Sequence, residues 1–144
     1  MTSWSDIERE VPELAAAARG FLDAHTHKTI ATLRKDGSPR ISGIEAAFAD
    51  GELTFGSMAR AVKVADLARD ARFALHSASD DPPGWKGDAK VAGRAVQTRS
   101  DEKSHHYRAD IDEVVVTTLA GDPPDRLVIE SWNPRRGYRR VERA

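Results

Sequence analysis

The chain has 144 residues, a length that suits one domain with a buried core, and we expect residues 1–144 to form a single domain. Lysine and arginine total 22 and aspartate and glutamate total 23, so the net charge of -1 argues against a strongly basic nucleic-acid-binding or membrane-surface protein. The sequence contains no cysteine, which excludes disulfides, thiolate metal sites and a cysteine nucleophile.

The amino-terminal segment predicts one helix. Ser5 followed by Glu8 matches a capping box, and Pro12 suits the first turn of a helix. One apolar face then predicts a helix over residues 12–25, formed by Leu14, Ala18, Phe21 and Leu22. The segment is acidic and lacks the apolar region of a secretory signal, and no apolar run is long enough to span a bilayer, so we expect a cytoplasmic protein without a membrane partner.

From His27 onward the sequence consists mainly of short β-forming runs separated by turns that contain Asp-Gly or proline. The predicted strands cover residues 28–33, 40–48, 52–57, 72–77, 88–98, 113–120 and 126–132, and the basic tail can add a final short strand. The predicted helices between them cover residues 60–69 and 100–110. Such closely spaced strands favour an antiparallel sheet, and six or seven of them are expected to close into a barrel or sandwich because closure removes exposed edges.

The helix start after the third predicted strand carries an unusual charge pattern. The stretch LTFGSMARAVKVADLARD, residues 53–70, opens its helix with Arg60 and Lys63, although the helix dipole favours acidic residues at that end. One hypothesis is an anion site formed by Ser57, the free backbone N–H groups and the two cations. The alternative is a solvated helix face that tolerates an unfavourable dipole interaction of about a few tenths of a kcal/mol. The spacing alone leaves both open.

Histidines and one glycine give weaker signals. His25 with His27, and His105 with His106, have no carboxylate partner at helical or hairpin spacing, so no metal site is predicted. Gly93 at the centre of a strand indicates a bend or a close approach of another chain segment.

Two aromatic segments have open interpretations. Trp85, in the proline-rich loop of residues 78–87, is either a lid over a ligand or an anchor for that loop. The segment RRGYRR, residues 135–140, has a composition compatible with single-stranded nucleic acid. In a nearly neutral chain we favour ion pairing across an interface or with an anionic cofactor, and we expect no nucleic-acid partner.

The order of these elements resembles the pyridoxamine 5'-phosphate oxidase-like family of flavin-binding split β-barrels. The likeness covers residues 28–98: strand, DGSP turn, strand, DG turn, strand, lysine-bearing helix, DARFAL strand and VAGRA strand. The segment ESWNPRRGYRR is similar to the family's E-x-W followed by a basic stretch. The resemblance implies a mainly β fold, a six- to seven-stranded antiparallel split barrel with an N-terminal helix and a helix inserted after the third strand. It also implies a homodimer with flavin sites at the subunit interface.

The resemblance also implies a set of cofactor-binding residues. The cofactor would be FMN, or alternatively a deazaflavin coenzyme of the F-420 type. Lys63 matches the family's phosphate-binding lysine, and Arg60 and Ser57 lie in its phosphate loop. Arg40 matches the arginine that starts the flavin-contacting strand, and Trp132 matches a carboxy-terminal tryptophan that reaches the flavin.

The match has departures that bear on activity. Residues 54–56 would pass the flavin ring or ribityl chain, but Glu45 stands where the oxidase has a lysine, and GYRRVER replaces its substrate-binding tail. We therefore do not predict pyridoxamine-phosphate oxidase activity. The prediction is a flavin-dependent oxidoreductase for a small organic substrate, with no assignable catalytic side chain because the cofactor carries the chemistry. The alternative is a non-catalytic flavin-, haem- or tetrapyrrole-binding carrier on the same barrel.

Overall fold

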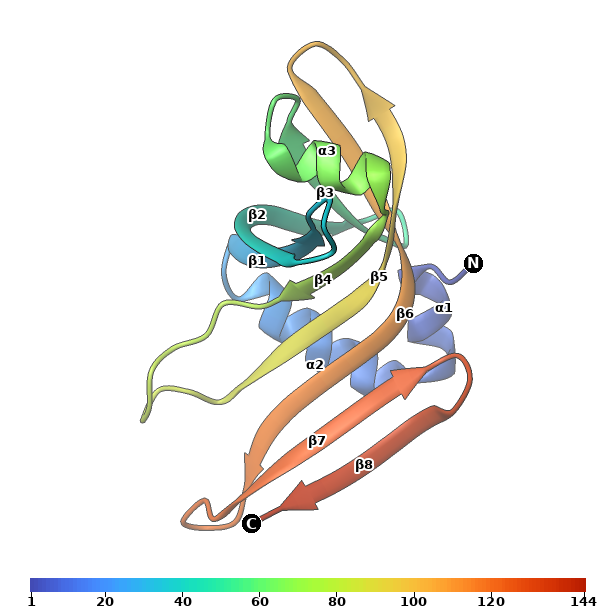
Figure 1. Ribbon diagram of the computed structural model, residues 1–144. Helices are drawn as coiled ribbons and strands as arrows, with labels where there is room; N and C mark the ends of the chain where they lie inside the picture. Colours follow the sequence, from blue (N-terminus) through green and yellow to red (C-terminus); the bar gives the residue numbers. More distant parts are fainter.

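A closed antiparallel barrel with an added hairpin forms the centre of the computed structural model, which describes residues 1–144 (Figure 1). The strand order is β3-β2-β1-β4-β5-β6-β7-β8, and β3 also pairs with β6, so the first six strands close on themselves. The strands are β1 His27–Leu33, β2 Pro39–Ala49, β3 Glu52–Met58, β4 Arg72–His76, β5 Gly87–Ser100, β6 Ser104–Ala120, β7 Arg126–Asn133 and β8 Gly137–Arg143. The predicted fold class is confirmed, and β7 and β8 extend the sheet beyond the barrel.

Three helices flank the barrel: α1 Trp4–Glu10, α2 Pro12–Asp23 and α3 Val62–Arg69. In Figure 1, α1 and α2 (blue) lie behind the long strands β5 and β6, and α3 (green) lies near β1 and β3. The helix predicted over residues 12–25 is confirmed as α2, and the predicted insert after the third strand is α3. No helix combines the length and the apolar character that crossing a membrane requires.

Helix α1 was not predicted, and its capping box differs from the expected one. Ser3 is the N-cap, and it exchanges hydrogen bonds with Asp6. Ser5 lies inside the helix, where its Oγ donates to the Gly51 carbonyl oxygen at 2.9 Å. The sequence contains two overlapping Ser-x-x-acid patterns, and the burial of Trp4 selects the first of them.

The helix predicted over residues 100–110 is wrong, because this segment forms the β5–β6 turn and the first half of β6. The Asp101 carboxylate accepts hydrogen bonds from the backbone N–H groups of Lys103 and Ser104 at 2.7 and 2.9 Å. Serine and aspartate favour such turns for the same reason that they favour helix caps, so the local signal was ambiguous. Every second side chain then enters the core, which is the strand period: Tyr107, Ala109 and Ile111.

One continuous hydrophobic core joins the barrel interior to the two amino-terminal helices. Inside the barrel, the Phe55 ring lies 5.4 Å from Tyr107 and 5.2 Å from Phe73, measured between centroids. Outside it, Trp4 of α1 packs 4.7 Å from Phe48 of β2. Burial of these aromatic rings supplies much of the stabilisation of the fold, since each removes a large apolar area from water.

Helix α3 is attached largely by polar contacts, since its buried residues are Asp66 and Leu67 and its N-cap makes no side-chain hydrogen bond. Asp66 is only 1% exposed, and its Oδ2 accepts hydrogen bonds from Thr32 Oγ1 and Arg40 Nε, both at 2.8 Å. Near the carboxyl end of the helix, Arg69 Nη1 donates to the Leu33 carbonyl oxygen at 3.1 Å. These contacts tie α3 to β1 and β2.

The Asp66 carboxyl is ionised because its partners outweigh its burial. Burial raises its pKa, but the hydrogen bonds from Arg40 and Thr32, with the charges of Arg40 and Arg69, hold the pKa below its ordinary value of 3.8. Arg69 Nη1 lies 3.5 Å from Asp66 Oδ1 and adds the second positive charge.

Gly93 marks the close approach that the sequence indicated. The β5–β6 register shifts at Ala92 and Gly93, and a Cβ atom on Gly93 would lie 2.0 Å from the Asp110 carbonyl oxygen. Only glycine fits at this irregularity without movement of the backbone.

We expect Gly93→Ala to lower the free energy of unfolding by about 2–3 kcal/mol, because the methyl group forces β5 and β6 apart. Urea denaturation followed by circular dichroism measures this change. Gly20→Ala is the matched control: a Cβ at Gly20 meets no atom within 4 Å, and alanine stabilises a helix by up to about 1 kcal/mol relative to glycine. Equal stability of the two variants would contradict the prediction.

We also expect a pH-dependent difference in stability between the unaltered protein and Asp66→Asn. The pKa of Asp66 is lower in the folded state, so its stabilising contribution is complete above the unfolded-state pKa and is lost as the pH falls through the folded-state pKa. The difference in the free energy of unfolding should be constant near neutral pH and shrink between about pH 4 and about pH 2. Urea denaturation of both proteins over this range tests it, and a difference that does not change with pH would refute it.

Candidate functional site

An open groove of about 820 Å³ lies where β2, β3, β5 and β6 meet. Strand register places four of its lining residues in one row across these strands: Glu45 opposite Gly56, Gly56 opposite His106, and His106 opposite Arg99. Residues at such paired positions point to the same face of a sheet. The row therefore places a carboxylate, a position without a side chain, an imidazole and a guanidinium side by side, in the order Glu45, Gly56, His106 and Arg99.

The gap in this row is made by Gly56. A Cβ atom at Gly56 would lie 3.3 Å from His106 Nδ1, so the imidazole ring lies beside the main chain of β3. His106 Nε2 lies 3.1 Å from Ser104 Oγ, and Thr98 Oγ1 donates to the His106 carbonyl oxygen at 3.2 Å. Two contacts thus fix His106, and the missing side chain leaves the groove floor at the level of the backbone.

Both signs of charge occur along the groove. The Glu45 carboxylate lies 3.8 Å from His27 Nδ1, and Arg99 is exposed at the far side. Hydroxyl groups of Thr54 and Ser57 also line it. A flat polar molecule with donors and acceptors on its edges matches this lining better than a purely apolar one does.

Lys63 lies outside the groove lining but contacts β2, one of the strands that form the groove. It lies in the first turn of α3, and its Nζ donates to the Gly43 carbonyl oxygen at 2.5 Å. Gly43 precedes Glu45 on the same face of β2, and β3 ends nearby at the groove residue Met58. The ammonium group has no carboxylate partner within 4.0 Å, and burial lowers its pKa.

Ser57 and Arg60 flank the path from β3 to α3. Ser57 lines the groove, and its Oγ donates to the Met58 carbonyl oxygen at 3.2 Å. Arg60 is exposed in the turn before the helix. The helix begins at Val62 rather than at residue 60, so Lys63 lies in its first turn and Arg60 precedes it.

Arg40 and Trp132 do not line the groove. Arg40 lies under α3, where its Nε bonds to Asp66, and its side chain is 28% exposed. Trp132 is buried in the core at 2% exposure, and its indole Nε1 has no hydrogen-bond partner. Of the predicted site residues, only Ser57 lines the groove, while Lys63 and Arg60 lie outside its lining, Arg40 lies beneath α3, and Trp132 lies within the core.

Sequence reasoning missed His106, Arg99 and Asp66. His106 was assigned to a helix, although the alternation of apolar and polar residues from Tyr107 to Asp112 was a signal for a strand. Asp66 has no local signal, because its partners Thr32 and Arg40 lie on two other elements. No group of three or more histidine, aspartate or glutamate side chains is placed to hold a metal ion.

Solved structures share this architecture at low sequence identity. A pyridoxamine 5'-phosphate oxidase-related, FMN binding protein from Nostoc punctiforme is 12% identical with a TM-score of 0.65, and the match covers 96% of each chain. PhzG from Burkholderia lata, solved with tetrahydrophenazine-1-carboxylic acid, is 12% identical with a TM-score of 0.65, covering 95% of this chain and 91% of PhzG. A heme binding protein from Mycobacterium smegmatis is 12% identical with a TM-score of 0.61, covering 90% and 87%. At these identities the likeness is one of fold.

A comparison of the sequence with the curated proteins finds no significant match. The family model described as pyridoxamine 5'-phosphate oxidase matches residues 14–131, which include most of α2, the whole barrel and most of β7. The chain therefore belongs to the pyridoxamine 5'-phosphate oxidase family.

Proposed function

We propose that the chain acts as one cofactor-binding domain that holds FMN and oxidises or reduces a small organic substrate. The observation that carries the proposal is the Lys63 ammonium group, which is partly buried, has no carboxylate partner, and contacts the Gly43 carbonyl oxygen two residues before the groove residue Glu45. A phosphate monoester supplies the missing negative charge, and the groove offers space for the attached ring system.

The other phosphate contacts that we propose are Arg60, Ser57 and Arg40. Arg60 and Ser57 border the strand-to-helix turn, where backbone N–H groups at a helix start favour an anion. Arg40 approaches from beneath α3. Trp132 as a ring contact stays a prediction from the family resemblance and has the least support, because its side chain lies in the core of its own chain.

The groove fits a planar ring for two reasons. Gly56 has no side chain, so a ring can approach the β3 backbone beside His106, and we propose that residues 54–56 pass the cofactor. Thr54, Ser57 and His106 can hydrogen-bond ring-edge atoms. A bound flavin supplies the hydride or electron transfer, and the protein orients it and shapes the substrate space. A deazaflavin coenzyme would need the same phosphate contacts and is the alternative cofactor.

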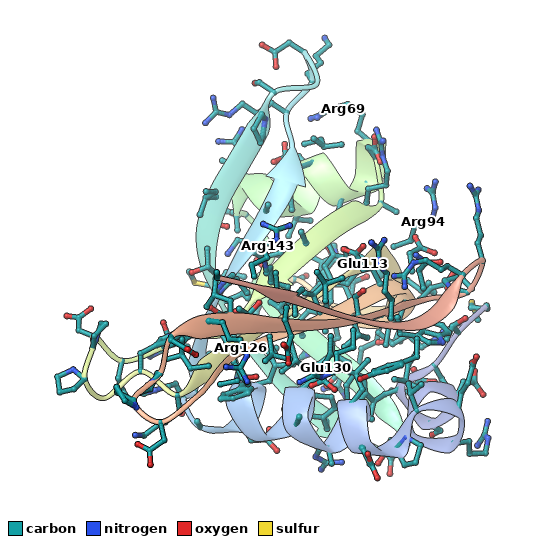
Figure 2. The ribbon with its side chains drawn as sticks, turned by 90° about the horizontal axis from the view of Figure 1, so that it is seen from below. Arg69, Arg94, Glu113, Arg126, Glu130 and Arg143 are labelled. Carbon is teal, nitrogen blue, oxygen red and sulfur yellow. The ribbon has the colours of Figure 1, made fainter.

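The outer face of the sheet suits a second copy of the chain. Ile41, which is 73% exposed, is followed across β1, β4 and β5 by Ala31, Ala74 and Ala92 at paired positions. The face continues to Glu113 of β6, which lies on the side away from α1 and α2 (Figure 2). Ile41 and Ala74 are exposed, and Ala31 and Ala92 are partly buried. A row of apolar side chains on an outer sheet face is typical of an interface, and we propose a homodimer through this face.

Haem or another tetrapyrrole is the competing ligand, since a relative with the same fold is a heme binding protein. The absorbance spectrum of the purified protein, followed by titration with FMN, the deazaflavin coenzyme and haem, separates these ligands. Binding of haem alone, or of none of the three, would refute the proposed function.

We expect Lys63→Ala with Arg60→Ala to weaken FMN binding by about 100-fold, because two of the three proposed phosphate-binding cations are removed. Fluorescence titration with FMN measures the dissociation constant, and circular dichroism checks that the fold is retained. Lys86→Ala is the control, since Lys86 is an exposed cation in the loop between β4 and β5, away from the groove. Loss of folding in step with loss of binding would instead indicate a structural role.

We expect Ala74→Lys to convert the dimer to a monomer, because it places a charge in the centre of the apolar row. Sedimentation velocity measures the mass. Ala16→Lys is the matched control, since Ala16, like Ala74, is an exposed alanine, but it lies on α2 and outside that row. A monomeric unaltered protein, or a dimer that persists in Ala74→Lys, would rule out this interface.

A further inference from the structure

A buried carboxylate lies beneath the proposed phosphate site, where its charge by itself repels an anion. We propose that Asp66 is the positioning residue of this site: it holds the Arg40 guanidinium and, through α3, the Lys63 ammonium group in place for a phosphate. This inference rests on the proposed function and adds to it a residue that does not touch the cofactor.

The first observation is how Asp66 holds Arg40. Thr32 and Arg40 stand directly opposite each other in the β1–β2 register, and Asp66 Oδ2 lies 2.8 Å from Thr32 Oγ1 and from Arg40 Nε. Only the Nε of the guanidinium is used, and its two terminal nitrogens make no hydrogen bond within the chain. Arg40 is thus fixed through Nε and keeps the two donors that bind phosphate in pairs.

The second observation is how Asp66 places Lys63. The two residues are three positions apart on α3, so they lie on neighbouring parts of one helix face. The only other buried residue of this helix is Leu67, and one apolar contact restrains a short helix weakly. The hydrogen bonds of Asp66 to β1 and β2 therefore set the rotation of α3, which brings Lys63 Nζ to the Gly43 carbonyl oxygen.

The third observation is that Asp66 cannot itself be a ligand. Its side chain is 1% exposed, and its carboxylate oxygens face Thr32, Arg40 and Arg69. The charges of Arg40 and Arg69 offset its repulsion of a phosphate, so what remains is its effect on geometry. A supporting residue of this kind raises affinity by reducing the freedom that the binding groups lose when the ligand binds.

The test compares FMN with riboflavin, which lacks the phosphate. The ratio of the riboflavin to the FMN dissociation constant reports the phosphate contribution alone, and fluorescence titration measures both constants. In Asp66→Ala we expect FMN affinity to fall about tenfold and riboflavin affinity to change by less than about twofold. Asp66→Asn should recover most of the loss, because an amide oxygen in the place of Oδ2 can accept from both Arg40 Nε and Thr32 Oγ1. The effects of Asp66→Ala and Arg40→Met should be less than additive in the double variant.

Two further variants distinguish a positioning role of Asp66 from a general structural role. Asp70→Ala removes a half-buried acid just beyond α3 that pairs with Arg72 rather than with Arg40, and it should leave both dissociation constants unchanged. If Asp66→Ala does not fold, Thr32→Val removes one hydrogen bond to the carboxylate and should weaken FMN, but not riboflavin, about threefold.

Two outcomes overturn the inference alone. An Asp66→Ala variant that binds FMN as well as the unaltered protein does shows that Asp66 positions nothing, and an equal loss of FMN and riboflavin affinity shows a general structural role. An unaltered protein that binds FMN no better than riboflavin overturns the proposed phosphate site, and this inference with it.

Discussion

The pairing of β3 with β6 is the contact on which the rest of the structure depends. It closes the barrel, encloses the aromatic cluster around Phe55, and removes the free edges that six antiparallel strands would otherwise expose. The same pairing brings Gly56 opposite His106 and so forms the floor of the groove. The same strand pairing therefore closes the barrel and forms the candidate site.

The helix that carries Lys63 is attached in a different way from the other two. Helices α1 and α2 bury apolar faces, whereas α3 relies on Leu67 and the ionised Asp66. A buried ion pair adds little net stability, because desolvation of both charges offsets their attraction, but it restricts geometry. That property suits a segment whose task is to hold a cation at one position beside the barrel.

Local patterns of the sequence were sufficient for most of the secondary structure. The Asp-Gly turns at residues 36–37 and 50–51 separated the first three strands, and the apolar face from Leu14 to Leu22 identified α2. The failures occurred where one local signal fits two structures. Asp101 closes a hairpin turn although its neighbours suggested a helix cap, and Ser3 rather than Ser5 caps α1 because tertiary burial of Trp4 decided between them.

The sequence by itself determined the fold class, the family resemblance and the cation at the start of α3, because each depends on the order of residues within one or two adjacent elements. Only the tertiary structure decided which residues share a site. The row from Glu45 to Arg99 crosses four strands, and Asp66 meets Thr32 and Arg40 from separate elements. Such contacts depend on strand register and barrel closure, which are set by packing of the whole core rather than by any local pattern.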